Sequence, residues 1–451
     1  MILPLVLYGA LFAIAAFAPL RWSLVAYLLL STIDFGAGGG GNIGILNAAK
    51  GILLPVYLLW RLRAYAGHQK IILAPIAWIF LVIYAGIAGF WSFFPVAALK
   101  LAGHMIGSLL ICFVFLRATK AGYVTPVVVI PVTAGALVIA ILRSLFMPNY
   151  GDEAARFTAF SSAQSFAAFL VALYCIALCS KTLRAGIRIT LCALLVAALA
   201  FDGSRIWAIG LAAATLLALL VSGVRPWVKI CACGLAIALA ASLIAEGDKV
   251  MMFVARQAES NRIAAAITAV YEGDIRSYGL GTYELRRGFD AKEIRAIENS
   301  SIDQLLFGHG TSNGVLIITG SIFKIGTDPN RLMHNEWLRV MYEWGVAGML
   351  LWLMFFGSIV IFAYQGLRRD PWGYSKPLLV YMPAFLLGLA GENIIAGAGN
   401  AVSVGFLLVI GLAGISHRSF AFRPPPRETP PVAVRIRPPR AARIAAEAGG
   451  G

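Results

Sequence analysis

His334 is the residue in this chain best suited to proton transfer, and it lies where a long polar segment meets an apolar helix. The stretch 334–348 reads HNEWLRVMYEWGVAG. A helix that enters lipid normally lacks charged groups, because charge within a membrane is costly and usually serves a site. An imidazole titrates near neutral pH, so His334 suits general base catalysis on a hydroxyl group. This junction is therefore the first place to expect chemistry.

The spacing of other residues in this stretch predicts how it packs. Glu336, Arg339 and Glu343 are three and four residues apart, so on a helix they can pair with one another. Gly345 and Gly348 would let a neighbouring helix approach closely. Helical periodicity puts the following residues on one face: His334, Leu338, Met341, Gly345 and Gly348.

The pattern H-N-x-x-L-x-x-x-x-E-x-G-x-x-G that begins at His334 resembles the C-terminal signature of the O-antigen ligase and O-antigen polymerase superfamily of bacterial membrane glycosyltransferases. Every fixed position of the signature is filled. Two shorter pieces also resemble this family: GSR at 203–205, which opens a hydrophobic span, and LFGHG at 306–310, late in a long loop. Together the three pieces cover about positions 200–350. The N-terminal half adds only a multispan architecture.

The resemblance implies an inverting, metal-independent glycan transfer of the C-type glycosyltransferase kind, with no cofactor. The donor would be a glycan on a polyprenyl pyrophosphate, and the acceptor a hydroxyl group of lipid A core or of a growing polysaccharide. His334 would be the catalytic base, and Arg205 would face the pyrophosphate. Arginine suits that task because its planar guanidinium binds phosphate oxygens in pairs and keeps its charge. Arg205 could instead lie at the headgroup level as an ordinary helix-end arginine.

A second phosphate-binding arginine is expected in the long loop, about 20 residues before the LFGHG piece, because the family tends to carry one there. Arg287 is the preferred candidate, with Arg286 beside it. Arg276 and Arg295 are also near, so the alignment leaves four candidates. Each of them taken alone is also explained as a solvated surface residue.

Three residues after His334 are expected to support it. Asn335 and Glu336 could orient the imidazole, although Glu336 could equally pair with Arg339. Glu343 has no outlet to solvent, so we expect a structural role in which it holds the helix in register with a basic partner.

Two more polar residues have open interpretations. Glu392 lies in an apolar setting at the outer end of the penultimate span, where it could pair with Arg205, orient His334 or simply be exposed in a loop. His309 lies between two glycines. It could contact an acceptor sugar, but tolerated variation at that motif position is the simpler interpretation.

Composition predicts an all-α membrane protein. Hydrophobic residues make up 60% of the chain and charged residues 13%, and the mean hydropathy of +0.82 excludes an ordinary soluble protein. A helix needs about 20 apolar residues to cross a bilayer, which predicts a polytopic bundle of about 12 or 13 transmembrane helices. The candidate spans are 2–20, 22–35, 43–60, 71–93, 96–116, 122–142, 158–179, 187–202, 205–222, 227–245, 338–364, 377–396 and 398–416.

The net charge of +16 reflects membrane topology and does not indicate a nucleic-acid partner. Basic residues gather in every second short connection and in the C-terminal tail, as the positive-inside rule requires of cytoplasmic segments. This places the tail in the cytoplasm and the segment 246–333 in the periplasm, outside the inner membrane. The outer compartment holds no nucleotide sugar, so a substrate there must carry its own activation. Residues 1–20 are expected to be a retained span.

Four regions follow from this pattern. Residues 1–245 are a transmembrane bundle, 246–336 form one large periplasmic helical loop, and 337–416 close the bundle. Residues 417–451 are a basic tail rich in proline and arginine, expected to be disordered and attracted to membrane lipids. The six cysteines fall inside apolar spans and match no zinc or disulfide spacing, so no metal site is expected.

Several functions compete at this point. Within the family, one large outer loop favours a ligase, which acts in lipopolysaccharide biosynthesis, over an O-antigen or exopolysaccharide polymerase. Transfer of the glycan to a protein is a third outcome. A glycolipid transporter or flippase would explain the spans but not the complete motif. A purely structural assembly partner would tolerate replacement of His334.

Overall fold

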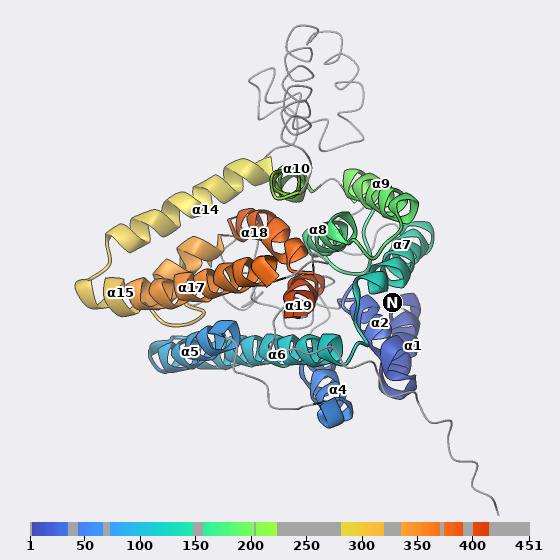
Figure 1. The fold of residues 1–451 in the computed structure, drawn as a ribbon. Coiled ribbons are helices and arrows are strands. Elements are labelled where there is room, and N and C mark those ends of the chain that lie inside the picture. Colours follow the sequence, from blue (N-terminus) through green and yellow to red (C-terminus); the bar gives the residue numbers. More distant parts are fainter. Residues whose placement is uncertain are drawn as a thin grey trace, which may run out of the picture.

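Helices dominate the computed structural model, which describes residues 2–34, 44–65, 73–147, 157–202, 204–222, 281–319, 335–369, 374–390 and 400–414. Within these ranges the only extended pairing is an isolated bridge between Ile33 and Phe160. The predicted all-α class is therefore confirmed for the described part of the chain (Figure 1).

The helices of the first half are α1 (Ile2–Phe17), α2 (Leu20–Leu30), α3 (Gly44–Ala48), α4 (Leu54–Arg61), α5 (Leu73–Ala88), α6 (Pro95–Lys120), α7 (Val129–Phe146), α8 (Ala163–Cys179), α9 (Ala185–Asp202) and α10 (Arg205–Leu220). A single π-helical turn, Ala49–Leu53, joins α3 to α4. The second half holds α14 (Gly281–Glu298), α15 (Ile302–Phe307), α16 (Val315–Thr319), α17 (Glu336–Arg369), α18 (Lys376–Leu389) and α19 (Ala401–Ala413).

Four of the described helices are long and apolar enough to cross a membrane, which indicates a membrane protein. They are Pro95–Lys120, Pro126–Phe146, Ala185–Asp202 and Glu336–Arg368, and shorter apolar helices accompany them. The predicted span 227–245 lies outside the described residues, and a helix lies in each of the other predicted spans. The short second span corresponds to α2, which ends at Leu30.

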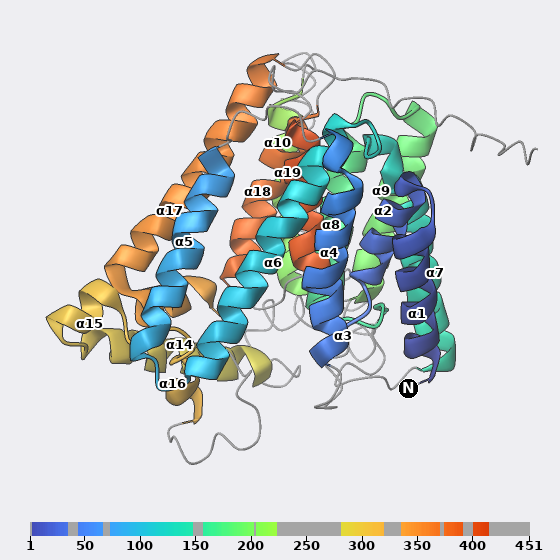
Figure 2. The same cartoon turned by 90° about the horizontal axis from the view of Figure 1, so that it is seen from below.

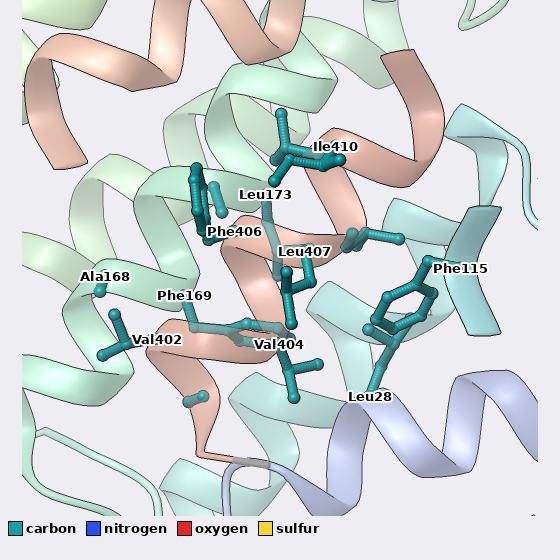
Figure 3. Packing of buried hydrophobic residues seen from close by; sticks show 14 of the residues in the cluster. Leu28, Phe115, Ala168, Phe169, Leu173, Val402, Val404, Phe406, Leu407 and Ile410 are labelled. Carbon is teal, nitrogen blue, oxygen red and sulfur yellow. The ribbon is translucent and has the colours of Figure 1, made fainter. Parts of the chain in front are cut away.

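Helix α19 lies at the centre of the core, between α6 and α8 (Figure 3). It is buried along its whole length, with Phe406 and Leu407 among the packed side chains. Asn400 begins this helix, since its side-chain oxygen accepts a hydrogen bond from the Ser403 backbone N–H at 2.8 Å. A helix that is apolar all round must be enclosed by others, and α19 meets that expectation.

Glycine sets the distance between α19 and α6. A Cβ atom added at Gly411 would lie 2.6 Å from the Cβ of Phe115. The carbonyl of Gly411 also accepts a hydrogen bond at 3.0 Å from the Thr119 hydroxyl of α6. Small residues at such crossings let two backbones approach closely. The resulting van der Waals contact stabilises helix association in lipid, where the hydrophobic effect does not.

The described loop helices α14, α15 and α16 lie at one end of the bundle, beside the ends of α5, α6 and α17 (Figure 2). Both α14 and α15 pack against α17. The start of α17, where the histidine-containing stretch leads into the bundle, is therefore covered by loop helices.

Helix α17 is not continuous, which corrects one prediction. Gly345 has φ 63° and ψ −164°, values outside the helical region. The helical face predicted to run from His334 through Gly345 to Gly348 is therefore broken at Gly345. Nor is the closest neighbour of Gly345 another bundle helix: a Cβ there would lie 2.6 Å from the backbone nitrogen of Gly308 in the loop.

We expect Gly411→Ala to destabilise the bundle, because the added methyl group would overlap Phe115. Overpacking of this kind costs about 1–3 kcal/mol. Gly103→Ala is the matched control, since Gly103 lies in α6 and a Cβ there meets nothing within 4 Å. Thermal unfolding in detergent should show a lower midpoint for Gly411→Ala only. Equal midpoints would contradict the close crossing.

Candidate functional site

The predicted site residues fall into three groups. His334 and Glu392 lie outside the described residues. Arg205 opens α10, while Arg286 and Arg287 lie in the first half of α14, the loop helix that packs on α17. The remaining predicted residues are Asn335, Glu336 and Glu343, whose side-chain contacts the structure describes.

Asn335 begins α17. Its side-chain oxygen accepts hydrogen bonds from the backbone N–H groups of Trp337 at 3.1 Å and Leu338 at 3.3 Å. Its carbonyl accepts the first helical hydrogen bond, from Arg339, at 2.9 Å. This is the arrangement of a helix N-cap, which satisfies N–H groups that otherwise have no partner. The start of α17 is thus set directly after His334.

Glu336 and Arg339 form a buried ion pair. The Arg339 Nε donates to Glu336 Oε2 at 2.8 Å, and Nη2 of the same guanidinium donates to that oxygen as well. The side chains are 0% and 1% exposed respectively. The pairing with Arg339, one of the two roles left open for Glu336, is present in the structure, whereas the other involves His334, which lies outside the described residues. Removing either partner would leave a buried charge uncompensated.

Glu343 joins α17 to the loop. Its Oε1 accepts a hydrogen bond from the backbone N–H of Gly314 at 3.1 Å, and its Oε2 lies 4.0 Å from Nη1 of Arg339. The residue is fully buried. One carboxylate therefore contacts both a loop amide and the guanidinium that already holds Glu336.

The break at Gly345 exposes backbone carbonyls that a continuous helix would have used. The carbonyl of Tyr342 accepts a hydrogen bond from the His309 N–H, and the carbonyl of Glu343 accepts one from the Gly310 N–H, both at 2.9 Å. Buried carbonyls need such partners, and here the loop supplies them. The LFGHG piece and the signature in α17 are therefore in direct contact.

We call residues 308–314 together with residues 342–345 the motif junction. Its close contact depends on Gly308 in the loop and on Gly345 in α17, and Gly310 lets the loop approach Ser92. Gly308 has φ 81°, and a Cβ there would overlap the carbonyl of Glu343. Gly310 has φ 103°, and a Cβ there would lie 2.9 Å from Cα of Ser92. Side chains rarely adopt these backbone conformations, and the space for a Cβ is absent as well.

The motif junction is also joined to the end of α5. The Thr311 hydroxyl donates to the carbonyl of Ala85 at 2.6 Å and accepts from the Trp344 indole N–H at 3.0 Å. The Tyr84 hydroxyl lies 3.1 Å from the carbonyl of Trp344. Hydrogen bonds thus connect three segments that are far apart in the sequence.

Sequence reasoning did not identify Tyr84, Ser92, Thr311 or Asn313 as part of this region. Ser92 follows α5, and its hydroxyl donates to the carbonyl of Thr311 at 2.6 Å. The side-chain oxygen of Asn313 accepts from the Phe93 N–H at 3.0 Å. The polar run TSNG after LFGHG was the available signal, because such residues favour turns.

His309 has packing partners for both its ring face and its ring edge. The ring stacks on Tyr342 with centroids 4.1 Å apart, and Nε2 lies 2.8 Å from the Ser300 hydroxyl. Partial burial lowers the pKa of the imidazole, so it is neutral at neutral pH. These contacts fit a residue that holds the junction turn against α17.

Glu293 of α14 is a buried carboxyl that the sequence did not single out. It is 0% exposed, and neither of its oxygens has a hydrogen-bond partner within the described part of the chain. Burial, with added repulsion from Asp290 and Glu343, raises its pKa to about 8, against the opposing effect of Arg339. Glu293 is therefore largely protonated at neutral pH.

An apolar pocket lies between α5, α6, α17, α18 and α19. Most of its lining is aromatic or aliphatic, and Ser108 and Ser403 are the polar contributors. The aromatic residues that line it are Trp78, Trp352, Phe355, Phe356, Phe385 and Phe406. Such a lining suits an apolar chain. In the described ranges, no group of three or more histidine, cysteine, aspartate or glutamate residues is placed to hold a metal ion.

Comparison of the chain with models of known protein families finds no match, and no curated protein matches it. The family resemblance therefore rests on the three sequence motifs. Two of them, LFGHG and the α17 signature, meet at the motif junction.

We expect Gly345→Ala to disrupt the motif junction. The substitution forces an alanine into a conformation reserved for glycine, which costs on the order of 1–3 kcal/mol, and its Cβ would lie 2.6 Å from the Gly308 nitrogen. Limited proteolysis should cut the 281–319 region faster in this variant. Gly357→Ala, in the same helix with nothing within 4 Å, is the control. Equal cleavage of the two variants would show that the junction tolerates a side chain.

Proposed function

We propose that this protein is a polytopic membrane glycosyltransferase of the O-antigen ligase kind. It transfers a glycan from a polyprenyl-pyrophosphate carrier to a hydroxyl group of lipid A core or of a growing polysaccharide. The reaction takes place on the periplasmic face of the bacterial inner membrane, proceeds with inversion and uses neither a metal ion nor a cofactor.

The motif junction is the observation that carries this proposal. Two pieces of sequence that resemble the same family lie in direct contact, although they are separated by more than 30 positions. The contact holds the loop against α17 at residues 342–345, seven to ten positions after Asn335, the residue that follows His334. Helix α14, which carries Arg286 and Arg287, packs on the same helix. These contacts support a site in which the base and the loop arginines come from elements that pack together.

The proposed chemistry needs a base and a cationic site for the leaving group. His334 removes the proton from the acceptor hydroxyl, and that oxygen attacks the anomeric carbon of the donor sugar. The bond between that carbon and the pyrophosphate oxygen breaks, and the polyprenyl pyrophosphate departs with the bonding electrons. Arg205 and Arg287 stabilise the negative charge that develops on it.

The surroundings suit a lipid-linked donor. The helices indicate a membrane protein, and the aromatic pocket between α5, α6, α17, α18 and α19 suits an apolar chain. A donor that is already a pyrophosphate ester carries its own activation, as chemistry outside the cytoplasm requires.

We expect His334→Ala to abolish glycan transfer in liposomes that contain the purified protein, a polyprenyl-pyrophosphate oligosaccharide and a lipid A core acceptor. Loss of a general base lowers the rate by about 10²- to 10⁴-fold. His417→Ala is the control, because that histidine has no proposed role. Normal transfer by His334→Ala would overturn the base assignment. Chain extension without acceptor would indicate a polymerase, and lipid movement without transfer would indicate a transporter.

We expect Arg287→Lys to slow the same reaction, because lysine cannot bind two phosphate oxygens with a planar fork. Loss of one such charge-stabilising contact costs roughly 10²- to 10³-fold in rate. Arg295→Lys is the matched control on the same helix, at an exposed position. If Arg295→Lys is slow and Arg287→Lys is normal, the phosphate contact belongs to Arg295 instead.

A further inference from the structure

Among the described residues, Glu293 belongs to a group of buried charges in which acidic side chains outnumber basic ones. Glu336 and Glu343 contact the guanidinium of Arg339, the charge of Arg339 also acts on Glu293, and none of the four side chains is more than 1% exposed. If all four ionise, the group carries a net charge of −2, from three negative charges and one positive charge. A buried excess charge of that size is strongly unfavourable.

The three carboxylates do not share the guanidinium equally. Glu336 takes two hydrogen bonds from Arg339. Glu343 lies 4.0 Å from the guanidinium and accepts a hydrogen bond from the Gly314 amide. Neither oxygen of Glu293 has a hydrogen-bond partner among the residues that the structure describes. The least compensated carboxyl is therefore on α14, and the other members of the group are on α17.

This difference matters because α14 also carries Arg286 and Arg287. Glu293 lies six residues after Arg287 in the same helix. A contact that fixes Glu293 against α17 therefore also fixes the position of the helix that carries both arginines. A neutral Glu293 carboxyl can lie against the charged group. An ionised Glu293 would add a second unpaired negative charge beside Glu343.

We propose that Glu293 is a positioning residue whose bound proton lets α14 dock on α17, and that loss of this proton releases α14. The charged groups that act on it are Asp290 on α14 and Arg339 and Glu343 on α17, and Glu336 and Tyr342 lie beside Arg339 and Glu343 respectively. Helix α16 has the sequence VLIIT and contributes no ionisable side chain, and the adjoining turn contributes His309. The effect on glycan transfer rests on the proposed function, whereas the docking itself does not.

The direction of the pH effect follows from linkage. The docked state raises the pKa of Glu293 from 4.5 to about 8, so it binds the proton more tightly than the released state does. Docking is therefore strongest below 4.5, weakens as the pH rises through that interval and levels off above about 8. His309 cannot produce this weakening, because burial lowers its pKa, so that its titration favours the docked state as the pH rises.

Spin-label distances across the two helices test the proposal. Ala291→Cys on α14 and Leu353→Cys on α17 are exposed sites for the labels, in full-length protein whose native cysteines are replaced by alanine and which is held in lipid nanodiscs. We expect one narrow distance population at about pH 5, and a second, broader population that grows up to about pH 9. In the Glu293→Gln variant, which mimics the protonated carboxyl, the narrow population should persist at every pH.

Two controls make the outcome decisive. Glu298→Gln removes an exposed carboxylate from the same helix and should respond to pH as the wild type does. Infrared spectra of the wild type at neutral pH should contain a protonated-carboxyl band that Glu293→Gln lacks. The proposal is overturned if the wild-type distances do not change with pH, if Glu293→Gln changes as the wild type does, or if that band is absent.

The transfer assay then separates the two proposals. If the protein transfers glycan, the wild-type rate should fall at alkaline pH more steeply than the rate of Glu293→Gln. If no glycan is transferred but the spin-label distances behave as expected, the proposed function fails while the role of Glu293 in docking stands. If transfer occurs and the distances are independent of pH, the role of Glu293 in docking fails while the proposed function stands.

Discussion

The break in α17 at Gly345 is the constraint on which the rest of this region depends. In a continuous helix, the carbonyls of Tyr342, Glu343 and Trp344 would accept hydrogen bonds from the next turn. In the broken helix they accept hydrogen bonds from other segments. The donors are the backbone N–H groups of His309 and Gly310 in the loop and the hydroxyl of Tyr84. Because the loop approaches so closely, Gly308 must be glycine as well. One backbone conformation thus joins a long loop, a bundle helix and the end of α5.

The second feature of this region is a set of charged side chains at a position where a membrane helix normally has none. Glu336, Arg339 and Glu343 lie within the first turns of a helix that continues into an apolar span. Such charges persist in an apolar setting only when they are paired or hydrogen-bonded. In the described ranges, Oε2 of Glu343 and both oxygens of Glu293 accept no hydrogen bond. An arrangement of this kind makes the position of α14 responsive to protonation, and α14 carries two of the arginines proposed to bind phosphate.

The all-α fold could be predicted because apolar runs of membrane length leave the backbone few alternatives to a helix. The pairing of Glu336 with Arg339 followed from helical spacing alone. The spacing did not predict the break at Gly345, because a glycine in such a pattern is equally consistent with the close packing of two continuous helices. The contacts of Tyr84 and Thr311 connect distant segments, and periodicity contains no information about them. Glu293 lies on a polar helix where nothing local distinguishes a buried carboxyl from the exposed ones.

In the mechanism that we propose, the start of α17, the loop helix α14 and the first turn of α10 together hold a pyrophosphate. An experimental structure of the protein with a polyprenyl pyrophosphate bound in nanodiscs tests this most directly. We expect density for the pyrophosphate beside Arg205 and Arg287, within reach of His334, with the motif junction intact. Pyrophosphate density at a place remote from all three residues would contradict it.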